Sequence, residues 1–233
     1  MDAENHGRYF VTASYDGTLR LFDYSQKPLH SAPLHSAPIT SFCILPAPST
    51  SNDSSADEET HLIATASHDL TARLSRLTIS DSNVSIEPQA ALHLHTAPLS
   101  SIAASPTGSH ILTASWDGLL GVWDTSVPDR DEVTLPASAV GERKKRRRVD
   151  AEDQVVKRKA PQAVLHSHVG RVSAVLWRKD GSSTEGASVD DAYAVSCGFD
   201  STVRLWDVEH QICVHTIVRS CVHFDPLPLH RIG

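Results

Sequence analysis

The sequence has no run of about eighteen or more apolar residues, the length needed to span a membrane. The opening MDAENHGRYF lacks a basic region followed by an apolar segment, so it is not a secretory signal. Aromatic residues make up only 6% of the 233 residues, but apolar residues reach 40%, which is enough for a buried core. We therefore expect a folded chain with no membrane contact.

Motifs for catalysis and metal binding are also missing. No G-x-x-x-x-G-K-[ST] loop and no H-E-x-x-H pair is present, and the 14 histidines are scattered. The four cysteines show neither C-x-x-C spacing nor the rhythm of zinc ligands, which favours free thiols in a reducing compartment. We expect a protein that is not an enzyme, without cofactor or metal.

Positive charge is scarce outside one short block. The chain has a formal net charge of -7, yet the segment 142–159 holds nine Lys or Arg against four acidic residues. The remainder holds 12 basic and 24 acidic residues. Proteins that bind nucleic acid spread positive charge over a folded face, so this distribution argues against a folded nucleic-acid groove.

Internal repetition decides the expected fold. Four segments align: RYFVTASYDGTLRLFD, HLIATASHDLTARLSR, SHILTASWDGLLGVWD and AYAVSCGFDSTVRLWD. Each has an apolar run, a turn with aspartate and a second run with alternating apolar positions, which is the pattern of a β-hairpin. The turn aspartates are Asp16, Asp69, Asp117 and Asp200.

Further apolar strands flank the hairpins, so the repeating unit is predicted to be a sheet of four antiparallel strands. A sheet of this size cannot bury both faces alone, and radial stacking of such sheets gives a propeller. We predict an all-β partial propeller over residues 1–217. Its repeats lie around 8–31, 35–94, 95–124 plus 162–167, and 168–217, with an insert at 125–161 and an atypical tail at 218–233.

The third repeat, HTAPLSSIAASPTGSHILTASWDGLLGVWD, resembles a WD40 repeat. His95, Ser115, Asp117 and Trp123 stand at the four hydrogen-bonding positions of that family. The resemblance implies that the aspartate accepts from the histidine, which engages the serine hydroxyl, which reaches the indole N–H. Ser115 lies in an apolar strand without the sharp turn of a nucleophilic serine, so we interpret the set as structural.

The other repeats match this set in part. The matching residues are His35, Ser67 and Asp69 in the second repeat, His168, Asp200 and Trp206 in the fourth, and Ser14 and Asp16 in the first. Ser75 and Phe22 replace the tryptophan of the second and first repeats, and Gly198 takes the serine position of the fourth. Only the third repeat is therefore predicted to hold a complete network.

Several segments together resemble the fungal YTM-type ribosome biogenesis factors, whose animal counterpart is WD repeat-containing protein twelve. They are RYFVTASYDGTLRLFDYSQK, HLIATASHDLTARLSR, ERKKRRRVD and AVSCGFDSTVRLWDVEHQICVHTI. The resemblance implies a non-enzymatic scaffold in a nucleolar complex for pre-rRNA processing and maturation of the 60S large ribosomal subunit. The implied partners are a larger WD40 protein, a pescadillo-type protein and the pre-60S particle, in the nucleolus and nucleoplasm.

The same resemblance implies a ring of seven blades and an N-terminal ubiquitin-like domain that engages a midasin-type ATPase. The sequence carries four repeats and begins within the first, so we expect a fragment that forms an incomplete ring. Contact with the ATPase is not expected, because the ubiquitin-like domain is absent from this sequence. The alternative is a nuclear WD40 adaptor in a chromatin or ubiquitin-ligase complex.

Two basic clusters lie in the insert, separated by eight residues. They are Arg143, Lys144, Lys145, Arg146, Arg147 and Arg148, and then Lys157, Arg158 and Lys159. This spacing is typical of a two-part nuclear import signal, which importin binds in an extended and exposed form. We expect the insert to be disordered, because it is polar and unpatterned. A solvated loop without a receptor, or direct contact with rRNA, are the alternatives.

Overall fold

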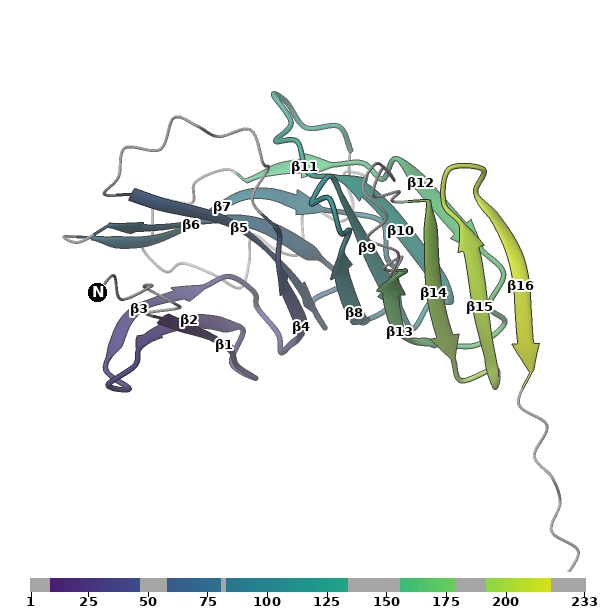
Figure 1. Ribbon diagram of the computed structural model, residues 1–233, viewed down its shortest axis with the longest axis horizontal. Coiled ribbons are helices and arrows are strands. Elements are labelled where there is room, and N and C mark those ends of the chain that lie inside the picture. Colours follow the sequence, from purple (N-terminus) through teal and green to yellow (C-terminus); the bar gives the residue numbers. More distant parts are fainter. Residues whose placement is uncertain (1–8, 47–57, 81–82, 134–155, 179–191, 219–233) are drawn as a thin grey trace, which may run out of the picture.

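The computed structural model describes residues 9–46, 58–80, 83–133, 156–178 and 192–218. Over these ranges the chain forms β-strands and no helix, so no helix there could cross a membrane. The all-β prediction is confirmed. The strands form four sheets that follow one another in chain order along an arc, from purple to yellow in Figure 1.

Each sheet is built around one predicted hairpin. The first contains β1 (Tyr9–Ala13), β2 (Thr18–Asp23) and β3 (Pro28–Pro33). The second contains β4 (Ile39–Ile44), β5 (Glu58–Ser67), β6 (Ala72–Ser80) and β7 (Val84–Leu92), with β11 (Lys157–Lys159) at its edge. The third contains β8 (Leu99–Ala104), β9 (His110–Ser115), β10 (Leu119–Asp124) and β12 (Ala163–His166). The fourth contains β13 (Val172–Trp177), β14 (Tyr193–Gly198), β15 (Thr202–Asp207) and β16 (Ile212–Val218).

The hairpin turns share one backbone geometry. The residue after each turn aspartate has a positive φ, and these residues are Gly17, Leu70, Gly118 and Ser201. The left-handed conformation costs a residue with a side chain roughly 1–2 kcal/mol, which applies to Leu70 and Ser201. In all four turns the aspartate Oδ1 accepts the backbone N–H two residues further on, which holds the turn in place.

In the first three hairpins, apolar side chains at equivalent positions pack against the next sheet. Leu19 and Leu21 of the first sheet pack with Ile63 and Leu77 of the second. The equivalent positions in the next two hairpins are also buried, against the third and the fourth sheet respectively. They are Ala64, Ala66, Ala72 and Leu74, and then Leu112, Ala114, Leu120 and Val122. Face-to-face packing of successive sheets is the arrangement expected of propeller blades.

The same four positions of the fourth sheet are Val195, Cys197, Val203 and Leu205, and none of them is buried. Val203 is 38% exposed, and its cross-strand neighbour Ile217 is 58% exposed. No further sheet covers this face among the described residues, so the described part of the propeller is an open arc.

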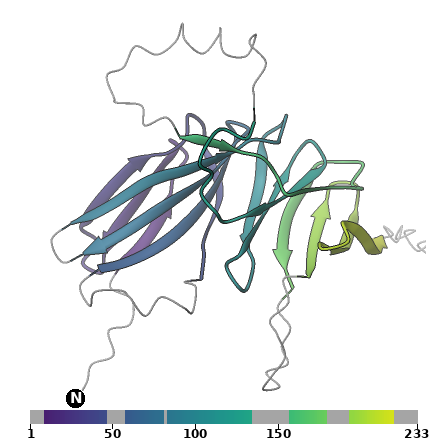
Figure 2. The ribbon, with the colours of Figure 1, turned by 90° about the horizontal axis from the view of Figure 1, so that it is seen from above.

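The strand β11 corrects the expected boundary of the insert. The residues 157–159 pair in parallel with β7, and Figure 2 shows this green strand beside the blue strands of the second sheet. The backbone N–H of His93 also donates to the Lys159 carbonyl oxygen at 3.3 Å. A segment predicted to be disordered up to residue 161 therefore ends in a strand that covers a sheet edge. Residues 134–155 lie outside the described ranges.

Candidate functional site

A chain of polar contacts crosses the interior of the third sheet. His95 Nδ1 lies 3.1 Å from Asp117 Oδ2, and His95 Nε2 lies 2.9 Å from Thr113 Oγ1. The indole N–H of Trp123 donates to the same Thr113 oxygen at 3.0 Å. With the His95 proton on Nδ1, every member of this chain has a partner: indole to hydroxyl, hydroxyl to imidazole, and imidazole to carboxylate.

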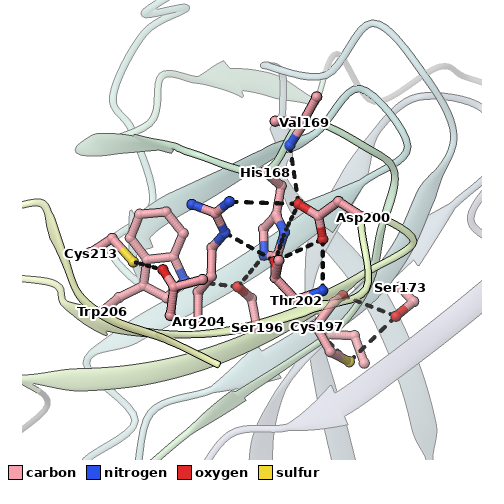
Figure 3. A network of polar contacts seen from close by, with 12 residues as sticks. His168, Val169, Ser173, Ser196, Cys197, Asp200, Thr202, Arg204, Trp206 and Cys213 are labelled. Atoms are coloured by element: carbon pink, nitrogen blue, oxygen red, sulfur yellow. Dashed lines mark hydrogen bonds and ion pairs between the residues drawn. The ribbon is translucent and has the colours of Figure 1, made fainter. Parts of the chain in front are cut away.

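The fourth sheet holds an equivalent chain, shown in Figure 3. His168 Nδ1 lies 2.9 Å from Asp200 Oδ2, and His168 Nε2 lies 2.6 Å from Ser196 Oγ. The indole N–H of Trp206 donates to Ser196 Oγ at 2.8 Å. The predicted departure at Gly198 therefore does not break the network, because the hydroxyl comes from Ser196.

The hydroxyl assigned from the sequence is wrong by two residues. Ser115 Oγ donates to the backbone carbonyl oxygens of Ala97 and Pro98, at 2.9 and 3.1 Å, whereas His95 Nε2 is hydrogen-bonded to Thr113 Oγ1. Residues two apart in a strand point to the same face of the sheet. The sequence alone therefore does not distinguish Thr113 from Ser115 as the hydroxyl that contacts the histidine. Thr113 Oγ1 is the oxygen within hydrogen-bond distance of both the imidazole and the indole.

The second sheet has a shorter chain. His35 Nδ1 lies 3.0 Å from Asp69 Oδ2, and His35 Nε2 lies 2.8 Å from Thr65 Oγ1. Ser67, the predicted hydroxyl, donates instead to the Ala37 carbonyl oxygen. Ser75 occupies the tryptophan position, and its buried Oγ has no hydrogen-bond partner. The chain therefore ends at Thr65.

The first sheet places its two predicted residues at the turn without a histidine partner. Asp16 accepts hydrogen bonds from the backbone of Thr18 and from the Arg20 guanidinium. Ser14 contributes backbone hydrogen bonds to the turn, and its side chain also hydrogen-bonds to the Asp16 carboxylate. At the tryptophan position, Phe22 stacks on Phe10 with ring centroids 5.1 Å apart. Apolar stacking therefore takes the place of the polar chain in this sheet.

The fourth sheet brings together a serine, a histidine and an aspartate in the order of a hydrolase triad. Ser196 is 1% exposed and the His168 side chain is 0% exposed, so neither is open to a substrate. Ser196 Oγ also accepts the Trp206 indole N–H, so one of its lone pairs is already occupied. A catalytic serine needs exposure and an oxyanion hole. The Ser196–His168–Asp200 set therefore has a structural role: it connects strand β14, the loop before β13 and the hairpin turn.

Burial and hydrogen bonds act in opposite directions on the pKa of the turn aspartates. Burial acts to raise the pKa of Asp69, Asp117 and Asp200. Hydrogen bonds from histidine, from turn hydroxyls and from backbone amides favour the ionised carboxylates and outweigh burial. The pKa of each of the three carboxyl groups therefore lies below its ordinary range.

These lowered pKa values predict a loss of stability in acid. A carboxyl group with a lowered pKa in the fold adds stability above its unfolded pKa of about 4, and this stability is lost as the pH falls toward the folded value. We expect the melting temperature to fall steeply from pH 5 to pH 2. Asp117→Asn should lower it at pH 7 and flatten the acid dependence, whereas substitution of the exposed Asp129 by Asn should do neither. The melting temperature is measured by circular dichroism at each pH. An equally steep pH dependence for both variants would contradict the role of the Asp117 carboxylate.

Only the second of the two predicted basic clusters lies within the described residues. Arg143 to Arg148 lie outside the described residues. In the second cluster Lys157 is exposed, whereas Lys159 is 1% exposed and its Nζ lies 2.5 Å from Asp124 Oδ1. Lys159 Nζ also donates to the carbonyl oxygen and hydroxyl of Ser126. The ammonium of Lys159 therefore faces the fold and not a receptor.

The described residues contain no group of three or more His, Cys, Asp or Glu arranged to hold a metal ion. Burial raises the pKa of the Cys43 thiol to about 11, and two backbone hydrogen bonds only partly oppose this shift. This thiol is therefore kept in its neutral form at physiological pH.

Comparison with known proteins matches the chain to one kind of repeat. The family described as "WD domain, G-beta repeat" matches residues 1–23, 86–124 and 159–207. The unmatched stretch between the first two ranges covers most of the second sheet, where Ser75 replaces the tryptophan. This gap therefore agrees with the shortened polar chain of that sheet.

Individual relatives carry a more specific name. "Ribosome biogenesis protein YTM1" of Laccaria bicolor is 50% identical over 216 residues, covering 91% of this chain and 45% of that protein. The Coprinopsis cinerea protein of the same name is 47% identical over 221 residues, with the same coverage of both chains. "Ribosome biogenesis protein WDR12 homolog" of Arabidopsis thaliana is 28% identical over 205 residues.

The chain spans less than half the length of these curated relatives. The similarity nevertheless extends along nearly all of this chain, and the sheets carry the polar chains that the WD40 resemblance implies. The chain is a WD40-repeat protein of the YTM1/WDR12 type.

Proposed function

We propose that the chain acts in ribosome biogenesis, as a non-enzymatic scaffold of a nucleolar complex required for pre-rRNA processing and maturation of the 60S large subunit. The observation that supports this most is the 50% identity, over 91% of this chain, to a protein named for ribosome biogenesis. Because the chain spans 45% of that relative, the proposal concerns the function that these four sheets contribute.

The geometry of the polar chains supports a scaffold role. The hydroxyls of Thr113 and Ser196 each join an imidazole to an indole inside a sheet, and the imidazoles reach the turns. Such fully paired buried networks fix loops in one arrangement, which suits a surface that other proteins bind. The Ser–His–Asp set of the fourth sheet is buried, which favours this role over hydrolysis.

For partners, the proposal includes a larger WD40 protein, a pescadillo-type protein and the pre-60S particle. It also includes nuclear entry through importin, which would read the basic block. Since Lys159 is buried against Asp124, importin would read the segment 143–148 and the exposed Lys157 while β11 stays paired. No contact with a midasin-type ATPase is proposed for this chain.

Affinity purification tests the proposed function. The full chain, tagged and expressed in a fungal host, should recover the pescadillo-type protein, the larger WD40 protein and large-subunit pre-rRNA. An unrelated WD40 propeller with the same tag is the control, and it should recover none of them. Recovery of chromatin or ubiquitin-ligase subunits without pre-rRNA would overturn the proposal and favour the nuclear adaptor.

A further inference from the structure

Each hairpin turn presents a ring immediately before its aspartate. The rings belong to Tyr15, His68, Trp116 and Phe199. The turn geometry needs the aspartate and the left-handed residue after it, but it does not need a ring at this position. Tyr15 is 81% exposed and Phe199 is 74% exposed, so these rings do not serve the core. Exposed aromatic residues that recur in this way are typical of an interaction surface.

The backbone of three turns is hydrogen-bonded to the loop that leads into the first strand of the same sheet. The N–H groups of His68 and Trp116 donate to the carbonyl oxygens of Pro38 and Pro98, each at 3.0 Å. Phe199 N–H donates to the Arg171 carbonyl oxygen at 2.8 Å. The turn aspartates also accept the N–H that follows each network histidine, as Val169 shows in Figure 3. The polar chains therefore fix the backbone that carries the rings.

Contacts between sheets join these rings into a row. The His68 and Trp116 ring centroids lie 5.2 Å apart, which links the second sheet to the third. The Arg171 guanidinium, on the loop before the fourth sheet, lies 4.7 Å from the centroid of the Trp116 ring. The same loop carries Val169, which is 93% exposed, and is hydrogen-bonded to Phe199. We call His68, Trp116, Val169, Arg171 and Phe199 the aromatic row.

The charge on the aromatic row comes from Arg171. Arg171 is exposed and makes no ion pair among the described residues. A guanidinium stacked on a ring keeps its N–H edges free, and these can bind a carboxylate in bidentate fashion. The turn aspartates beside it, Asp117 and Asp200, already accept bonds from their own histidines and loops.

We propose that the aromatic row is a docking surface for an extended segment of a protein partner that carries a carboxylate next to a large apolar side chain. The carboxylate pairs with Arg171, and the apolar side chain packs on Val169 and Phe199. Nucleic acid fits this surface less well, because a single-stranded groove needs several cations along the backbone and this row offers one that is unpaired. This binding surface does not depend on the proposed role in ribosome biogenesis.

Trp116 provides a direct readout, since the other three tryptophans are buried at 0%, 8% and 1% exposure. The probe is a phage library of random dodecapeptides, first depleted on the Arg171→Glu variant and then selected on the unmodified full chain. Retained peptides should be rich in Asp or Glu beside Leu, Phe or Trp, and as synthetic peptides they should change the Trp116 fluorescence. Their affinity should fall at least tenfold on Arg171→Glu and on Phe199→Ser.

The matched control is Arg178→Glu, which reverses another exposed arginine that stacks on a ring, that of Tyr193 at 5.4 Å. This variant should bind the peptides as tightly as the unmodified chain, and all variants should keep its melting temperature. The proposal would be overturned if no peptide remained after depletion. It would also be overturned if the retained peptides bound Phe199→Ser as tightly as the unmodified chain. Binding of a uridine decanucleotide that changes Trp116 fluorescence and displaces the peptides would also overturn it, in favour of a nucleic-acid surface.

Discussion

Replacing Thr113 by valine should destabilise the chain strongly while preserving the shape of the side chain. The substitution removes the one oxygen that contacts both His95 Nε2 and Trp123 Nε1. Each of these two buried groups then lacks a partner, at roughly 1–3 kcal/mol per group. We expect a loss of about 3 kcal/mol, which lowers the melting temperature by about 6–12 °C for a domain of this size.

The second sheet offers the matched control, Thr65→Val. There the hydroxyl serves His35, and no indole is attached because Ser75 stands at that position. The loss should be about half of that for Thr113→Val, since one buried group is left unpaired instead of two. In the double variant Thr113→Val with Trp123→Phe the two effects should be less than additive. Equal melting temperatures for Thr113→Val and Thr65→Val would refute the shared role of the Thr113 oxygen.

The repeat made most of the fold predictable. The turn aspartates fix the hairpins, and alternation around them fixes which residues are buried, as at Leu112 and Leu120. Both signals are local, so a single sequence carries them. The local pattern does not determine which residue provides the hydroxyl of the polar chain, Thr113 or Ser115. This choice depends on how far the Trp123 indole reaches across the hairpin, where Trp123 pairs with Ile111 and not with Thr113.

The strand β11 could not be predicted from its own residues. Lys157 and Arg158 are polar, and nothing in their pattern suggests a strand. The strand exists because β7 has a free edge and because Asp124 and Ser126 supply three acceptors for the Lys159 ammonium. These partners are more than thirty residues away in the sequence. The same residues, read as a basic cluster, suggested exposure instead.

The aromatic row has a signal in the sequence, one position before each turn aspartate. The positions before the turn aspartates are Tyr, His, Trp and Phe, which is apparent once the four hairpins are aligned. The hydrogen-bonding side chains of the third repeat, which carry the WD40 resemblance, are buried, so they do not include these rings. Only the exposure of Phe199 and the stacking of Arg171 on Trp116 separate a surface role from a core role.

Asp124→Asn should release β11 from the second sheet. Lys159 Nζ is held by Asp124 Oδ1 at 2.5 Å, and the Lys159 side chain is 2% exposed. Lys159 is buried although Asp124 is half-exposed, so removing the carboxylate leaves a buried charge uncompensated, at a cost of up to about 3–5 kcal/mol. The cost cannot exceed the free energy with which residues 157–159 bind to the second sheet. If it did, the strand would detach and the ammonium would return to water. Detachment is therefore the expected outcome, and unfolding of the propeller is not.

Hydrogen exchange at single amides measures this release. The His93 N–H donates to Lys159, and the Glu132 N–H donates to the Arg158 carbonyl oxygen, so both lose protection when β11 detaches. We expect exchange at least 100-fold faster in Asp124→Asn, which corresponds to about 3 kcal/mol. Arg158→Gln, which breaks only the exposed pair with Asp131, should change exchange less than about threefold. Lys159→Met should lie between them, because the half-exposed Asp124 stays hydrated without its partner. Similar rates in Asp124→Asn and Arg158→Gln would mean that the buried ammonium does not hold the strand.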